Sequence, residues 1–171
     1  MKKASFSAIL STFVVCFIFW ILLTWTFTVQ EIVAGVLVSL VVALFSAKYL
    51  IHNKPFHLFN PVKLFTLIFY SCFVFMWELL KANWDVAKRA FSMKINPGIV
   101  RIEADVKSEY AQAMLANSIT LTPGTITMDI AEEDDKLYYY IHWVDVATTK
   151  TDEAGDAIKG TLEKWTRRIW E

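Results

Sequence analysis

The first part of the chain is almost free of charge. Between residues 4 and 47 the only charged side chain is Glu31. A helix needs about 20 mostly apolar residues to cross roughly 30 Å of hydrocarbon, and residues 4–30 are long enough and apolar enough to do so. Residues 32–47 form a second, shorter apolar run. The sequence therefore predicts that residues 1–52 form a transmembrane helical hairpin.

Positive charge predicts how this hairpin is oriented. Loops on the cytoplasmic side of a membrane carry an excess of Lys and Arg. The connection between the two apolar runs, residues 28–31, has no basic side chain. We therefore expect the N-terminus, the end of the second run and the C-terminal domain to be cytoplasmic. The basic side chains that flank the hairpin are Lys2, Lys3, Lys48, His52, Lys54 and Lys63.

A third apolar stretch, residues 64–77, allows two interpretations. Pro61 suits the first position of a helix, and the helical pattern of residues 61–94 continues beyond the apolar part. The stretch is short for a membrane span, and basic side chains flank it at both ends. We favour an amphipathic helix that lies along the membrane interface, with a third transmembrane helix as the alternative.

The second apolar run has small residues at every fourth position: Gly35, Ser39, Ala43 and Ala47. Residues four apart lie on one face of a helix, and a face of small residues lets two membrane helices approach closely. The pattern predicts a helix-packing face. Its partner is either the first apolar run or another protein.

Residues 97–171 have the pattern of a small soluble domain. Alternation of apolar and polar residues predicts strands, and apolar positions three and four apart predict helices. The order strand, helix, strand, strand, helix indicates an α+β cytoplasmic domain of ferredoxin-like type. The predicted elements are strands near residues 100–106, 125–130 and 137–143, and helices near residues 107–119 and 152–169.

The sequence contains no pattern of residues typical of catalysis, metal binding or cofactor binding. A net charge of zero argues against nucleic acid as a partner. The acidic turn at residues 132–135 lacks the spacing of a calcium-binding loop. Glu31 lies at the predicted external turn, and Glu78 is expected to pair with Lys81. We therefore predict that the chain is not an enzyme, and we expect no ion path through it.

A short threonine-rich run joins the predicted helix at 107–119 to the next strand. It reads Thr120, Leu121, Thr122, Pro123, Gly124, Thr125. Proline stops a helix, glycine accepts a left-handed backbone, and threonine hydroxyls can bond to backbone groups that the helix end leaves free. We expect this run to be a structural turn.

This run, continued by residues 126–130, closely resembles the signature of the E subunit of Mrp-type (Mnh or Pha) multisubunit cation/proton antiporters. Residues 96–99 and 140–142 are also similar to that family. The resemblance implies a multi-pass subunit of a bacterial inner membrane complex that exchanges monovalent cations, typically Na⁺, for protons.

Within such a complex the resemblance implies an accessory role. Ion-conducting residues of the family belong mainly to other, larger subunits, so none is assigned here. The chain would pack against neighbouring subunits and support assembly of the complex. The alternative is a free-standing membrane-anchored binding module that recruits a cytoplasmic partner.

Overall fold

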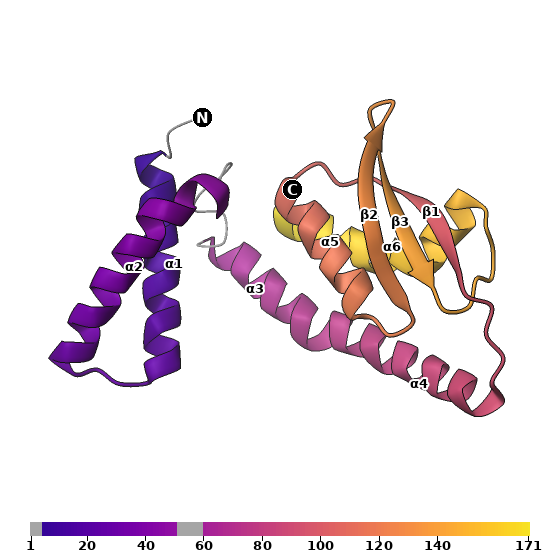
Figure 1. Cartoon of the computed structure of the whole chain (residues 1–171), viewed down its shortest axis with the longest axis horizontal. Helices are drawn as coiled ribbons and strands as arrows, with labels where there is room; N and C mark the ends of the chain where they lie inside the picture. The colour runs from indigo at the N-terminus through magenta and orange to yellow at the C-terminus, as the bar shows by residue number, and fades with distance from the viewer. Residues whose placement is uncertain (1–4, 51–59) are drawn as a thin grey trace. The chain divides into compact units, whose positions relative to one another are not determined.

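The computed structural model describes residues 5–50 and 60–171, with the side chains of residues 48–50 left out. The chain divides into two compact units, which meet in sequence between Asn60 and Pro61. The first unit contains two helices. The second contains one long helix and the α+β domain (Figure 1).

The first unit is a pair of helices, α1 (Phe6–Thr24) and α2 (Val29–Leu50), which lie side by side (Figure 1). The α1 helix ends at Trp25, whose backbone is left-handed (φ 51°) and whose N–H donates to the Ile21 carbonyl. Phe6–Thr24 and Val29–Ala47 are long and apolar enough to cross a membrane. The predicted helical pair at the N-terminus is confirmed.

The second unit begins with a long helix in three consecutive parts: α3 (Pro61–Phe69), a π-helical turn η2 (Tyr70–Phe75) and α4 (Met76–Ser92). Pro61–Ser92 as a whole is also long and apolar enough to cross a membrane. A π-helical turn widens the helix locally and shifts the faces of the residues that follow. Here it coincides with Tyr70, a buried residue that packs into the core of the α+β domain.

The α+β domain has the predicted order of elements. An antiparallel sheet with the strand order β1-β3-β2 is covered by two helices, as in a ferredoxin-like fold without its fourth strand. The predicted fold class is therefore confirmed. The elements are β1 (Gly98–Ala104), α5 (Glu109–Leu121), β2 (Thr125–Glu133), β3 (Lys136–Trp143) and α6 (Thr151–Trp170).

The domain core lies between the sheet and helices α5 and α6. Its largest fully buried side chains include Ile102 of β1, Leu115 of α5 and Tyr139 of β3. The Tyr139 hydroxyl donates to the Gln112 carbonyl at 3.0 Å. Burial raises the pKa of the Tyr139 phenol, so it stays a neutral donor at any physiological pH.

Strand β2 presents its threonines, not its large apolar residues, to the helices. Ile126 and Met128 are 50% and 59% exposed, whereas Thr125 is buried. The reason is local, because the hydroxyls of Thr125 and Thr127 donate to carbonyls of α5, which lies against this side of the strand. Alternation alone identified the strand without identifying which of its faces is covered.

Candidate functional site

The threonine-rich run closes the C-terminal end of α5 through side-chain hydrogen bonds. The Thr122 hydroxyl donates to the Ser118 carbonyl at 2.8 Å, and the Thr125 hydroxyl donates to the Ile119 carbonyl at 2.7 Å. The last four carbonyls of a helix have no partner within the helix. The two hydroxyls therefore supply bonds at the point where Pro123 prevents the helix from continuing.

Gly124 has the backbone conformation and the surroundings that only glycine tolerates. Its φ of 94° lies in the region that other residues rarely adopt. A Cβ atom here would lie 3.0 Å from Cγ1 of Val144 and 3.3 Å from Cγ2 of Val86 in α4. The Gly124 carbonyl also accepts the Val144 N–H at 2.8 Å. The turn is thus packed tightly between the end of β3 and the long helix.

The two other residues of the run have different surroundings. The Thr120 hydroxyl accepts the backbone N–H of Thr127 at 3.1 Å, which joins the last turn of α5 to β2. Leu121 is 65% exposed. The structure thus brings all the threonines of the run into one hydrogen-bonded turn and leaves Leu121 outward.

A second contact joins this end of α5 to the long helix. The Tyr70 hydroxyl donates to the Ser118 hydroxyl at 2.9 Å, and both groups are buried. The Tyr70 ring also packs near Trp165 of α6, with 6.4 Å between ring centroids. Sequence reasoning missed Tyr70, although a hydroxyl in the middle of an apolar run was the available signal.

Polar contacts also hold the long helix near each of its ends. Near its start, Lys63 Nζ donates to the Arg168 carbonyl of α6 at 2.8 Å. Near its end, Arg89 forms an ion pair with Asp145, just after β3, and another with Asp85 at 2.8 Å. The long helix therefore contacts the domain near both of its ends and at Tyr70.

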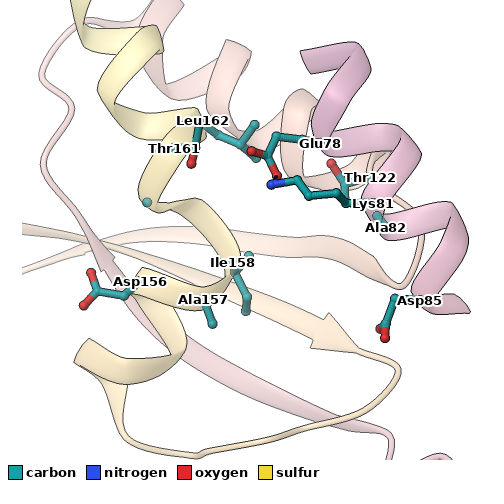
Figure 2. A pocket seen from close by; sticks show the side chains of 11 residues that line it. Glu78, Lys81, Ala82, Asp85, Thr122, Asp156, Ala157, Ile158, Thr161 and Leu162 are labelled. Carbon is teal, nitrogen blue, oxygen red and sulfur yellow. Dashed lines mark ion pairs between the residues drawn. The ribbon is translucent and has the colours of Figure 1, made fainter. Parts of the chain in front are cut away.

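A polar cleft of about 280 Å³ lies between α4 and α6 (Figure 2). Glu78 and Lys81 form an ion pair at 2.7 Å within it, as the sequence predicted. Asp85 points into the same region but pairs with Arg89. Across residues 5–50 and 60–171, no group of three or more His, Cys, Asp or Glu side chains could hold a metal ion.

The small residues of α2 face α1. Ser39, Ala43 and Ala47 are almost fully buried, and a Cβ atom on Gly35 would lie 2.6 Å from Cδ1 of Trp20 in α1. The Trp20 indole N–H donates to the Glu31 carbonyl at 3.1 Å and so joins the two helices near their connection. This places the expected packing face within the hairpin itself.

Comparison with known proteins identifies the family. The profile of a family described as "Na+/H+ ion antiporter subunit" matches residues 13–169. The Na(+)/H(+) antiporter subunit E1 of Staphylococcus aureus (strain JH9) is 33% identical over 156 residues, which cover 90% of this chain and 92% of that protein. The protein of strain Newman with the same name has the same identity and coverage.

A solved structure with 38% sequence identity shows the same fold. A chain of the membrane-bound sulfane sulfur reductase, an archaeal respiratory membrane complex, is 38% identical with a TM-score of 0.82, covering 96% of this chain and 99% of that one. A chain of the Mrp complex from Dietzia sp. DQ12-45-1b is 25% identical with a TM-score of 0.43, covering 65% and 96%. Because the family profile extends over nearly the whole sequence, as the resemblance predicted, the chain belongs to the MNHE family of Na⁺/H⁺ antiporter subunits.

Proposed function

We propose that this chain is a structural subunit of a multisubunit monovalent cation/proton antiporter, that the cation is Na⁺, and that the chain supports assembly without carrying the ion path. The observation that carries this proposal is the distribution of charge in the two N-terminal helices. From Phe6 to Ala47 the only charged side chain is Glu31, in the first turn of α2. Ion and proton paths through membranes need ionisable or polar groups at depth.

The inner surface of the hairpin is also unsuited to conduction. The α2 face that meets α1 is made of small residues that are buried, and Trp20 fills the space beside Gly35. Close packing of this kind leaves van der Waals contact between the helices and no room for a hydrated ion. A packing role for the hairpin agrees with this arrangement.

The α+β domain would then lie on the cytoplasmic side. The excess of Lys and Arg on one side of the hairpin supports this orientation. The threonine-rich turn would act as a structural pivot, because it touches α5, β3 and the long helix together. We propose that the domain braces neighbouring subunits from this position.

Co-purification tests the proposal. The full chain, tagged at its C-terminus, is extracted in a mild detergent, and the native mass and composition of the product are measured. We expect a large assembly that contains antiporter-like polytopic subunits. A lone chain, in a detergent that preserves such complexes, would contradict the proposal and favour a free-standing membrane-anchored binding module.

A further inference from the structure

The outward face of the long helix is a continuous apolar stripe. Its residues recur every three or four positions along the helix, and all are exposed. The opposite face packs on the α+β domain, through Tyr70 and its neighbours. The members of this apolar stripe are Val62, Phe65, Phe69, Phe73, Met76, Leu80 and Trp84, of which Phe69 also packs near Trp165 of α6, with 5.6 Å between ring centroids.

The contacts with the domain argue against a membrane span. They extend from Lys63, which donates to the Arg168 carbonyl, to Arg89, which pairs with Asp145. These two positions are 26 residues apart, or about 39 Å along a helix, which is more than the roughly 30 Å of hydrocarbon. A spanning helix that kept these contacts would carry α6, with Arg167 and Arg168, into the hydrocarbon.

Charge and aromatic residues next to the stripe match a bilayer surface. Trp84 is followed four residues later by Lys88, so the two lie on one side of the helix. Lys88 Nζ lies 5.6 Å from the centre of the Trp84 ring. Tryptophan prefers the headgroup layer of a membrane, and lysine beside an apolar helix face binds anionic lipid.

We propose that the helix Pro61–Ser92 lies in the plane of the membrane, with the apolar stripe in the headgroup layer of an anionic bilayer and the α+β domain on its other side. Lys88 contacts lipid phosphate. The Lys88 side chain, beside Trp84, favours an anionic surface. The helix also begins only eleven residues after the end of α2 at Leu50. This inference concerns membrane contact and goes beyond the assembly role.

Depth measurements test the geometry. The full chain, purified with whatever subunits accompany it, is placed in nanodiscs of phosphatidylcholine and phosphatidylglycerol. In a cysteine-free background, a nitroxide is attached at one position at a time, and its collisions with oxygen and with a water-soluble nickel chelate are compared. The variants are Phe65→Cys, Phe73→Cys, Leu80→Cys and Trp84→Cys, with Glu132→Cys at the exposed hairpin of β2 and β3 as the aqueous control.

The expected result is a similar shallow depth, about 5–10 Å into the headgroup and acyl boundary, at all four stripe positions. A steady change in depth, about 28 Å between Phe65 and Trp84, would mean that the helix spans the membrane. Labels that are shielded from both agents would mean that another protein covers the stripe. Either of these results overturns the proposal, while the co-purification result would stand independently.

Charge reversal tests the role of Lys88. In the Phe73→Cys background, Lys88→Glu should raise exposure of the label to the nickel chelate in anionic nanodiscs, and much less in pure phosphatidylcholine. Lys136→Glu, on the hairpin of β2 and β3, is the control and should leave exposure of the label unchanged. An equal effect in both lipids would refute recognition of anionic lipid.

Discussion

Replacement of Gly35 by alanine tests the packing of the hairpin most directly. The added Cβ atom would lie 2.6 Å from Cδ1 and 2.9 Å from Nε1 of Trp20, whereas carbon atoms in good contact are about 3.5–4.0 Å apart. The indole must therefore move by about 1 Å. It is not free to do so without loss, because its N–H donates to the Glu31 carbonyl at 3.1 Å.

The expected change in the free energy of helix pairing follows from three contributions. Overpacking of a close contact typically costs about 1–3 kcal/mol. Loss of the Trp20 hydrogen bond costs about 0.5–1.5 kcal/mol. Alanine is a better helix former than glycine by about 0.8–1 kcal/mol, which offsets part of this. We expect Gly35→Ala to destabilise the helix pair by about 1–3 kcal/mol.

The assay measures separation of the two helices. The full chain in dodecylmaltoside is titrated with sodium dodecyl sulfate, and pairing of α1 and α2 is followed by energy transfer between dyes near their ends. Leu37→Ala is the matched control, because Leu37 lies in α2 and is exposed. Leu37→Ala should leave the midpoint of the sodium dodecyl sulfate titration nearly unchanged, whereas Gly35→Ala should lower this midpoint.

A second pair of variants, made in a chain that already carries Trp20→Ala, tests whether the effect of Gly35→Ala comes from its contact with Trp20. If the steric account is right, Gly35→Ala should lose its destabilising effect when Trp20→Ala is also present, since the obstructing ring is gone. Equal midpoints for Gly35→Ala and Leu37→Ala would refute the reasoning. So would a full penalty that persists without the indole.

Three further predictions concern other parts of the chain. Gly124→Val places a branched side chain at a φ of 94° and should lower the yield of assembled complex several-fold on native gels; wild-type yield and transport would show that the turn is not a pivot. Thr166 has a fully buried hydroxyl without a partner in residues 5–50 and 60–171, so Thr166→Val should raise the free energy of unfolding in denaturant by about 1 kcal/mol, and a decrease would indicate a hidden partner. Glu31→Gln should leave Na⁺-dependent proton exchange in membrane vesicles intact, and a clear loss would place Glu31 on the ion path.

Local patterns predicted those parts of the fold that depend on local physics. The charge-free runs identified the N-terminal helices, and alternation identified the strands and their order. The same patterns did not reveal that β2 turns Ile126 and Met128 outward, because both faces of this strand contain residues that suit burial. Only the hydrogen bonds of Thr125 and Thr127 with α5 decide which face is covered.

For a related reason, local sequence patterns do not predict contacts between segments that are far apart in the chain. The residues of the threonine-rich run themselves predict a turn. Its partner on the long helix, Val86 beside Gly124, is 38 residues away in sequence, and Tyr70, which bonds to Ser118 at the end of α5, is 48 residues from that serine. A periodic pattern indicates that a face is apolar without indicating what covers it.

The long helix shows why this matters for function. By length and composition Pro61–Ser92 can cross a membrane, and composition alone cannot separate a spanning helix from one that lies on the surface. What distinguishes them is that the face opposite the apolar stripe is already occupied by the domain. A spanning helix would not contact a soluble domain over its length in the hydrocarbon. This helix contacts the α+β domain both at Lys63 and at Arg89. In the proposed geometry the apolar stripe is the membrane-facing side of one folded unit.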